Sequence, residues 1–439
     1  MNKRILLWSI TAALAGFLFG FDTVVISGAE QTIQAVWHLS PALHGAAIAS
    51  ALYGTVAGAL IGGYLSDRLG RRVTLLLIGV LYLMGALWSA LATDVYSFVI
   101  ARVIGGVGIG LSTVAAPLYI SEISPPMYRG RLAGMFQFNI VFGILVAYLS
   151  NALLAGTGEN AWRWMLGVAT LPSLIYTLMA LSLPESPRWL LARRNDATSA
   201  RAVLTRIDPN ADQAAIEAAI RDIVSGIPAA DGANRLWTWR LRQPIMLAIM
   251  IAAFNQLSGI NAILYFAPRI FRLAGLVSEA ALLQSIGIGI TNLIFTFVGL
   301  WLIDRAGRRT LLFIGSLGYI ASLLLVSWSF YTAHYALVPA GIFAFIAAHA
   351  IGQGAVIWVF IAEIFPNRQR AAGQALGSST HWIFAALITT VFPVFVTAFS
   401  PTTVFLFFAF MMTLQLIWTK MLLIETKGIP LEQIQGRWS

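Results

Sequence analysis

Long apolar stretches separated by short polar segments run along nearly the whole chain of 439 residues. Each stretch holds about 20 residues, the length that an α-helix needs to cross the hydrocarbon core of a bilayer. Lipid offers no partners to backbone groups, which excludes open sheets, and the ten-residue alternating pattern of membrane barrels is absent from the sequence. We therefore predict an all-α membrane protein with twelve spanning helices, at about residues 5–27, 44–66, 73–92, 97–121, 131–154, 163–183, 243–268, 281–303, 310–330, 338–363, 371–397 and 401–423.

Composition supports this prediction and narrows the chemistry. Length alone would suggest two or three soluble domains, but 59% of the residues are hydrophobic, only 10% are charged, and the mean hydropathy is +0.80. Soluble domains carry about 25% charged residues. The chain has no cysteine, which excludes a disulfide framework, a thiolate nucleophile and a cysteine metal site.

Basic residues are distributed unevenly along the chain, whose net charge is +10. Of 28 Lys and Arg residues, Arg102 lies inside a span, Arg163, Arg269 and Arg272 lie on loops opposite the N-terminus, and the other 24 share the N-terminal side. Because Lys and Arg concentrate in cytoplasmic loops, we expect both termini in the cytoplasm and a multi-pass protein of the cell (inner) membrane. The basic excess then requires no nucleic acid partner.

Residues 184–242 interrupt the apolar pattern with a charged segment. Within it, Asp212 precedes the sequence AAIEAAIRDI, whose apolar residues recur at helical spacing, so we expect two or three short amphipathic helices on the cytoplasmic membrane face. The segment divides the chain into four parts: an N-terminal six-helix bundle (1–183), a helical linker (184–242), a C-terminal six-helix bundle (243–423) and a cytoplasmic tail (424–439).

The two halves of the chain repeat each other. GYLSDRLGRR (63–72) matches LWLIDRAGRR (300–309), with 237 residues between Asp67 and Asp304. YISEISPPMYRGRL after span 4 matches FIAEIFPNRQRAAG after span 10 at an offset of 241 residues. Two motifs at nearly one offset indicate duplicated halves, the architecture of transporters that work by alternating access around a midplane site.

These repeated motifs place acidic and basic residues at helix ends on one side. The positive-inside rule explains the basic residues but not the acids at matching offsets. We expect ion pairs between helices that hold the cytoplasmic side shut in one state, and exposed pairs of about 0–1 kcal/mol each suit a switch that must also break. The expected gating residues are Asp67, Arg71, Glu122, Arg129, Asp304, Arg308, Glu363 and Arg370.

The first span contains one ionised residue, Asp22, near its far end. An unpaired charge in hydrocarbon costs roughly 2.5 kcal/mol or more, so such a residue is paired or used. Asp22 either reaches the headgroups at the membrane edge or pairs with Arg102. The N-terminus mimics a signal peptide, but we expect it to remain as the first helix, because the apolar run continues past any cleavage point and Asp22 makes sense only in a retained helix.

Span 7 contains NQLSGINAILYF, with Asn255, Ser258, Asn261 and Tyr265 within a 120° arc. Gln256 lies off this arc on a straight helix, but Gly259 and Pro268 permit an unwound segment that turns it inward. Amides both donate and accept hydrogen bonds without net charge, as sugar hydroxyls require, although they also bond helix to helix. The glycine run RVIGGVGIG lacks the strand–turn–helix context of a dinucleotide site and fits helix packing, so we expect no cofactor.

Several of these segments together resemble the sugar porter family of the major facilitator superfamily, and the resemblance extends from end to end. They are GFDTVVISG, DRLGRR and DRAGRR, RVIGGVGIG, PESPRWLL, QLSGIN, IWVFIAEIFP and ETKG. Two positions depart from the family pattern: Leu300 stands where its twin has Gly63, and Ile424 stands where a proline is usual. The resemblance implies two pseudo-symmetric bundles of six helices.

The resemblance also implies a sugar site. It points to Gln137, Asn255, Gln256, Asn261 and Asn292 as polar contacts, to Trp358, Trp382 and Phe19 as aromatic contacts, and to His349 and His381 as specificity residues. Many members carry two glutamines where this chain has Asn255–Gln256, which shortens the first amide. Histidines at both places are typical of the fructose-selective animal facilitators, which lack a tryptophan at the position of Trp358. Each histidine can equally be a hydrogen-bonded interior residue.

Proton-coupled members of the family carry Asp and Arg at the positions of Asp22 and Arg102, whereas passive animal members have Asn for the Asp. We therefore expect a monomer that takes up a monosaccharide, a hexose and by preference fructose, by proton symport within membrane lipid. A passive uniporter, or glucose, xylose or galactose as the substrate, are the alternatives. A drug/proton antiporter is disfavoured by the interior amides. An enzyme is disfavoured because no catalytic or metal-binding set is present in the sequence.

Overall fold

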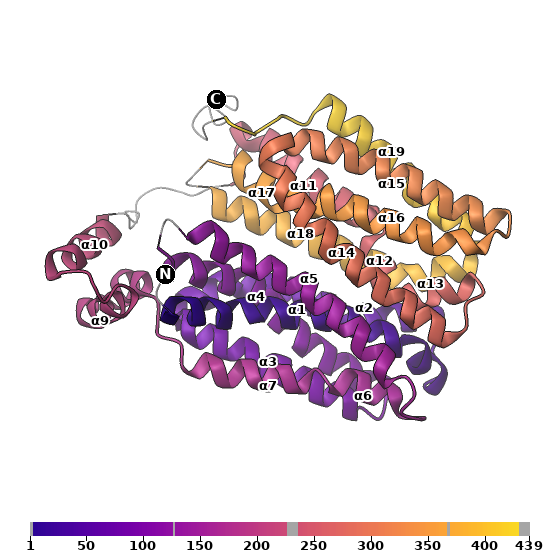
Figure 1. The fold of residues 1–439 in the computed structure, drawn as a ribbon, viewed down its shortest axis with the longest axis horizontal. Helices are drawn as coiled ribbons and strands as arrows, with labels where there is room; N and C mark the ends of the chain where they lie inside the picture. Colours follow the sequence, from indigo (N-terminus) through magenta and orange to yellow (C-terminus); the bar gives the residue numbers. More distant parts are fainter. Residues whose placement is uncertain (1–2, 126–127, 226–235, 367–368, 430–439) are drawn as a thin grey trace. The chain divides into compact units, whose positions relative to one another are not determined.

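The protein is described by a computed structural model for residues 3–125, 128–225, 236–366 and 369–429 (Figure 1). Twelve helices in this part of the chain are long and apolar enough to cross a membrane, which confirms the predicted all-α membrane fold.

The helices of the first half coincide with the predicted spans. They are α1 (Lys3–Val36), α2 (Pro41–Leu69), α3 (Arg71–Leu91), α4 (Val95–Ile123), α5 (Arg129–Leu154), and α6 (Ala161–Gly167) with α7 (Thr170–Leu181) as the sixth span. The predicted end of the first span at residue 27 is too early, because α1 continues to Val36. The polar residues of this extension find partners inside the protein, as described below.

Three spans in the described part of the chain consist of more than one helix. They are the sixth, the seventh, which begins with α11 (Arg242–Leu257) and α12 (Ile260–Tyr265), and the tenth, with α16 (Val338–Ile351) and α17 (Gln353–Ile364). The remaining helices of the second half are α13 (Ala267–Leu273), α14 (Ser278–Ala306), α15 (Arg308–Tyr331), α18 (Arg370–Ala398) and α19 (Pro401–Met421).

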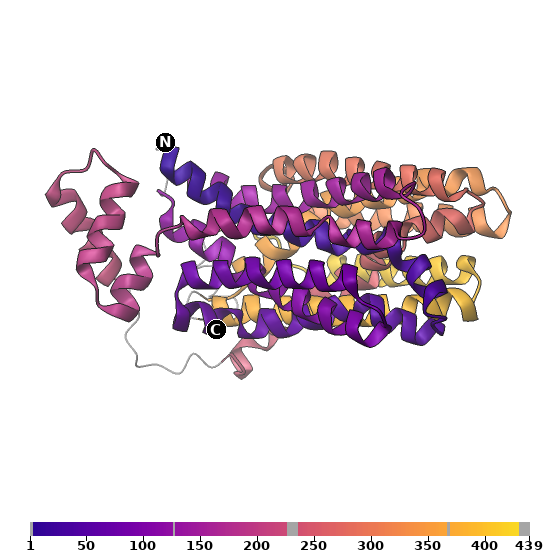
Figure 2. The ribbon, with the colours of Figure 1, turned by 90° about the horizontal axis from the view of Figure 1, so that it is seen from below.

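The described chain forms two compact units. The first contains residues 1–22, 54–143 and 166–233, and the second contains residues 23–53, 144–165 and 234–439. In the first unit α3 packs on α4 and α7, and in the second α15 packs on α16 and α19 (Figures 1 and 2). The division of the chain into four parts that the sequence suggests stays a prediction.

Small residues bring helix backbones into contact in the first unit. A Cβ atom on Gly20 of α1 would lie 1.8 Å from the carbonyl oxygen of Ile140 on α5. A Cβ atom on Gly110 of α4 would lie 2.3 Å from the carbonyl oxygen of Thr55 on α2. Only glycine permits this approach, so the packing function predicted for the glycine run of α4 is confirmed at Gly110.

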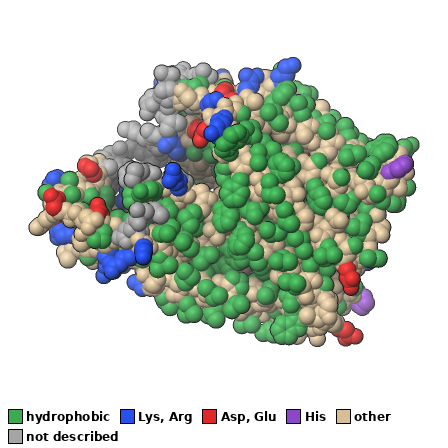
Figure 3. All heavy atoms as spheres, viewed as in Figure 1, with side chains coloured by type: hydrophobic (Ala, Val, Ile, Leu, Met, Phe, Trp, Pro, Cys, Tyr) green, Lys and Arg blue, Asp and Glu red, His purple; other side chains and the backbone are tan. Residues whose placement is uncertain are grey.

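The predicted short helices after the sixth span are present as α8 (Pro187–Trp189), a π-helical turn (Leu190–Arg194), α9 (Ala197–Ile207) and α10 (Gln213–Ser225). Asp212 caps α10, because its carboxylate accepts a hydrogen bond of 2.7 Å from the backbone N–H of Ala215. Apolar side chains of these helices pack into a cluster of their own, including Trp189, Val203, Ile216 and Ile220. Elsewhere hydrophobic side chains dominate the visible surface, as expected for lipid-facing helices (Figure 3).

Candidate transport site

Asp22 and Arg102 form a buried ion pair within the first unit. Nη1 of Arg102 on α4 donates to Oδ1 of Asp22 on α1 at 2.7 Å, and Nη2 lies 3.3 Å from the Asp22 carbonyl oxygen. The two residues are 6% and 3% exposed, so the structure favours the pair over a headgroup contact. Neither Oδ2 of Asp22 nor Nε of Arg102 has a hydrogen-bond partner among the described residues. The carboxylate therefore keeps one oxygen on which a proton can be placed without displacing Arg102.

The predicted break in span 7 is present at Gly259. The helix α11 ends at Leu257, Gly259 has a left-handed backbone (φ +87°), and α12 begins at Ile260. A Cβ atom at this glycine would lie 2.7 Å from the ring of Phe408, so a side chain is excluded by both conformation and space. Pro268 lies at the start of α13.

Gln256 meets His381 beside this break. Nε2 of Gln256 lies 3.1 Å from Nε2 of His381 on α18 and donates to Oδ1 of Asn255 at 2.9 Å. His381 is flanked by Trp358 and Trp382, with ring centroids 5.1 and 4.8 Å away. Five of the predicted substrate residues, on α11, α17 and α18, are thus brought together within the second unit.

Two buried polar atoms near this cluster lack partners in the described part of the chain. They are Oε1 of Gln256, an acceptor, and Nδ2 of Asn261, a donor. Burying an amide group without a hydrogen bond costs free energy, and natural cores avoid it. Hydroxyl groups of a sugar can donate to such an acceptor and accept from such a donor, and an apolar sugar face can pack on the rings of Trp358 and Trp382.

The other predicted substrate residues are less closely grouped. His349 on α16 has a partner inside the protein, because its Nδ1 lies 2.5 Å from the hydroxyl of Tyr319. This contact fits the interpretation of His349 as a hydrogen-bonded interior residue. Asn292 is buried on α14 in the second unit, whereas Gln137 and Phe19 are half-buried residues of the first unit.

Arg71 is the centre of the first predicted gating cluster. It donates to both oxygens of Glu122 at 3.0 and 2.9 Å, to Asp67 at 2.9 Å and to the Ser66 carbonyl at 3.1 Å. The cluster joins α2, α3 and α4 within the first unit. The side chain of Arg129, a further predicted member, lies outside the described residues.

Arg308 has the same partners in the second unit. It donates to both oxygens of Glu363 at 3.1 and 2.8 Å, to Asp304 at 3.2 Å and to the Ile303 carbonyl at 3.0 Å. The predicted member Arg370 donates to the carbonyl of Ala362 at 2.9 Å. The repeat detected in the sequence is therefore also a repeat of geometry.

Each cluster contains a carboxylate that our sequence analysis missed. Glu185 accepts from the backbone N–H of Arg71, and Glu425 accepts from the backbone N–H of Arg308, both at 2.9 Å. Burial raises the pKa of Glu185, and the N–H groups of Ser186, Arg72 and Arg71 oppose this shift. The signal was present, because PES and ETK lie in equivalent places 240 residues apart.

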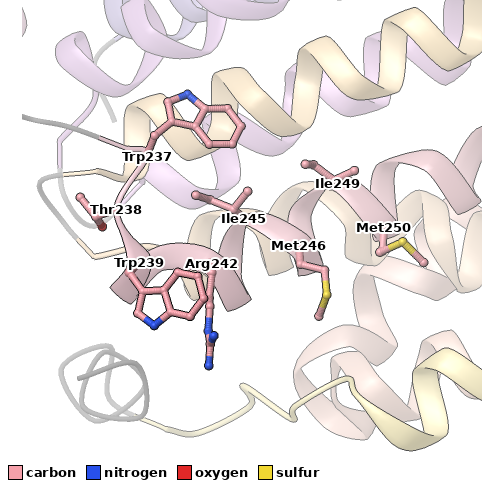
Figure 4. A pocket seen from close by; sticks show the side chains of 8 residues that line it. All are labelled: Trp237, Thr238, Trp239, Arg242, Ile245, Met246, Ile249 and Met250. Atoms are coloured by element: carbon pink, nitrogen blue, oxygen red, sulfur yellow. The ribbon is translucent and has the colours of Figure 1, made fainter.

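The hollow in Figure 4 contains none of the predicted substrate residues. It has a volume of about 430 Å³ and is lined by Trp237, Thr238, Trp239, Arg242, Ile245, Met246, Ile249 and Met250. The Arg242 guanidinium lies 4.2 Å from the ring centre of Trp239. Because this lining is almost entirely apolar, it does not offer the paired donors and acceptors that a sugar needs.

The chain is similar over its whole length to known sugar transporters. The family model described as "Sugar (and other) transporter" matches residues 8–438. The arabinose-proton symporter of Bacillus subtilis is 35% identical over 445 residues, which cover 99% of this chain and 95% of the relative. A glucose transporter of Staphylococcus epidermidis is 36% identical over 436 residues, which cover 97% of this chain and 95% of the relative.

A solved structure has the same architecture. It is the inward open conformation of the xylose transporter of Escherichia coli, which is 31% identical, with a TM-score of 0.87 over 99% of this chain and 100% of that one. This likeness confirms the predicted fold class: twelve spanning helices in two pseudo-symmetric bundles of six, with short helices between the bundles.

Proposed function

The chain belongs to the sugar transporter family of the major facilitator superfamily, and on this premise we propose that it carries a monosaccharide across the membrane together with a proton. The observation that carries the coupling proposal is the buried pair of Asp22 and Arg102, in which one carboxylate oxygen has no partner among the described residues. A purely structural ion pair would be more stable with hydrogen bonds to both carboxylate oxygens. A carboxylate that carries a proton needs one oxygen without a hydrogen-bond partner.

We propose that the sugar binds where Gln256 and Asn261 present their unpartnered amide atoms. Oε1 of Gln256 accepts from one hydroxyl, and Nδ2 of Asn261 donates to another. Trp358 and Trp382 cover an apolar face of the ring. We assign Gln137, Asn255, Asn292 and Phe19 to the same substrate path, as predicted from the family resemblance.

The sugar itself is proposed only as a monosaccharide, with a hexose as the first choice. The relatives described above are named for arabinose, glucose and xylose. Fructose stays a prediction that rests on two histidines, of which His381 contacts Gln256 and His349 contacts Tyr319. Glucose, xylose and galactose are the alternatives.

We propose that alternating access couples the two substrates. Facing outward, Asp22 takes a proton, which weakens its attraction to Arg102 and lets the loaded site close and turn inward. Facing inward, the proton leaves after the sugar, and the ion pair forms again. The two arginine clusters are proposed to stabilise one of these states from the cytoplasmic side, where we expect both termini from the distribution of Lys and Arg.

The decisive experiment is uptake of labelled sugars into proteoliposomes with and without an inward proton gradient. Accumulation that depends on the gradient supports symport. Equilibration that ignores the gradient supports a passive uniporter and leaves Asp22 with a structural function only. Fructose uptake that resists excess unlabelled glucose supports the preference for fructose. Competition by glucose or xylose would instead favour one of the alternative sugars as the substrate.

A further inference from the structure

A second buried ion pair joins α1 to α13. Glu30 on α1 has no exposed surface, and Arg269 on α13 binds both of its oxygens, with Nε–Oε1 at 3.0 Å and Nη2–Oε2 at 2.7 Å. Paired bonds of this kind are stronger and more directional than a single charged hydrogen bond. Both residues belong to the second unit.

Two further polar side chains complete this cluster. His44, near the start of α2, is fully buried, and its Nε2 lies 2.8 Å from Oε2 of Glu30. Oε1 of Gln34, one turn after Glu30 on α1, accepts from Nη2 of Arg269 at 2.5 Å. Three helix segments therefore meet at one carboxylate: the end of α1, the start of α2, and α13.

The segment held by this cluster is α13, which follows the end of span 7 at Tyr265. Gly259 separates α11 from α12, and Phe266 separates α12 from α13, so no continuous helix fixes the direction of α13. Phe266 stacks on Phe392 of α18 with ring centroids 5.0 Å apart, which links the start of α13 to α18. A buried ion pair holds such a segment firmly while it is closed, and water can solvate both charges once they part.

We propose that Glu30, His44 and Arg269 form a latch that fastens the ends of α1 and α2 to α13 and that must open before sugar enters from the side opposite the termini. This latch rests on the proposed transport function, because a carrier has to separate these segments in every cycle. It acts as a gate and not as a second coupling site, because both oxygens of Glu30 are already bonded.

The latch is testable through one introduced thiol, because the chain has no cysteine of its own. Thr390 on α18 lies against α2: its Oγ1 is 2.8 Å from the Tyr53 hydroxyl, and its carbonyl oxygen would lie 1.9 Å from a Cβ on Gly45. In a Thr390→Cys background, we expect Glu30→Gln to raise the rate of reaction with an impermeant maleimide, added outside, by about tenfold, because Arg269 is then buried without a counter-charge.

Arg272→Gln is the matched control. Arg272 lies on the same helix, but its partner Gln31 is uncharged and the contact is exposed, at 2.6 Å. We expect a labelling rate within about twofold of the parent, as for other exposed polar contacts. The double variant Glu30→Gln with Arg269→Gln leaves neither charge alone, and we expect it to return the rate to within about threefold of the parent.

If the parent and Glu30→Gln react with the maleimide at the same rate, and gel filtration shows that both are folded, the latch is overturned. An increase in the labelling rate of Arg272→Gln equal to that of Glu30→Gln would overturn it as well. If Glu30→Gln does not fold, the test uses the double variant and His44→Gln, which keeps both charges. A labelling rate of His44→Gln equal to that of the parent then overturns the proposal. Sugar uptake by the parent is measured separately. Faster labelling of Glu30→Gln without any uptake by the parent counts against the transport function and leaves the latch standing.

Discussion

Two buried carboxylates on α1, Asp22 and Glu30, are each paired with an arginine, yet their surroundings differ. They lie eight residues apart, about 12 Å along the helix. Glu30 has both oxygens bonded by Arg269 and a further contact from His44. Asp22 has one oxygen bonded by Arg102 and one without a partner among the described residues.

Under the functions proposed above, hydrogen-bond satisfaction, and not burial alone, distinguishes an ion pair that holds helices together from one that carries a proton. A proton on Glu30 would weaken the bonds that Arg269 and His44 make to its two oxygens. A half-bonded carboxylate can be neutralised at small structural cost.

The largest effect is expected for Asp22→Asn, which removes the proton-accepting oxygen and keeps the shape of the side chain. We expect gradient-driven accumulation of sugar in proteoliposomes to be lost, while exchange of labelled for unlabelled sugar continues. Asp94→Asn is the control, because Asp94 caps α4 and asparagine caps equally well. Undiminished accumulation by Asp22→Asn would contradict the assignment of the proton to this pair.

Replacing the arginine of each pair should lower the free energy of unfolding by different amounts. Arg269→Met leaves the fully bonded Glu30 as an uncompensated buried charge, and we expect a loss of about 3–5 kcal/mol in the free energy of unfolding. Arg102→Met should cost less, because Arg102 bonds one carboxylate oxygen of Asp22, whereas Arg269 bonds both oxygens of Glu30. Thermal unfolding in detergent, followed by tryptophan fluorescence, measures both variants. Equal losses would mean that the unpartnered oxygen of Asp22 has no consequence.

The comparison extends to uncharged groups at Gln256, whose Oε1 is unpartnered as Oδ2 of Asp22 is. We expect Gln256→Leu to weaken sugar binding by about 1–3 kcal/mol, because a buried sugar hydroxyl loses its acceptor. Gln415→Leu is the control: Gln415 is also a buried amide, but its Oε1 accepts from Gln353 and its Nε2 donates to Ser316, both at 2.8 Å. Calorimetric titration should show weaker binding only for Gln256→Leu, and equal weakening in both would place the sugar elsewhere.

The smallest effects are expected at the twin arginine clusters. The side chain of Asp304 is 82% exposed, whereas that of Asp67 is 44% exposed and is also bonded by Arg193 at 2.9 Å. We expect Asp304→Asn to change the free energy of unfolding by less than about 1 kcal/mol and Asp67→Asn to change it more. Differential scanning calorimetry compares the two directly, and the reverse order would show that exposure is not what decides the difference.

Much of this arrangement is predictable from local sequence. The spans follow from apolar length, and the break at Gly259 follows from a glycine inside a polar face. The pairing of Asp22 with Arg102 follows from the cost of burying either charge alone. These inferences need only the chemistry of a single segment or of two conspicuous residues.

The latch was missed because its signal is divided among distant segments. Glu30 and Gln34, one turn apart, lie beyond the predicted end of the first span at residue 27, and they continue α1. Arg269 stood out as one of three basic residues on the side with few of them, but nothing local indicated its partner. Which carboxylate it meets is decided by the packing of helices more than 200 residues apart in the chain.

The carboxylate of Glu425 has a consequence for biosynthesis. The first arginine cluster can be completed once Glu185 has been made, but the second waits for Glu425, 240 residues later. At about 5–20 residues per second, this delay amounts to roughly 12–48 s of translation. During that time Arg308 is already part of the nascent chain without its last acceptor. The closing step of assembly therefore depends on a segment made 240 residues after the one that completes the first cluster.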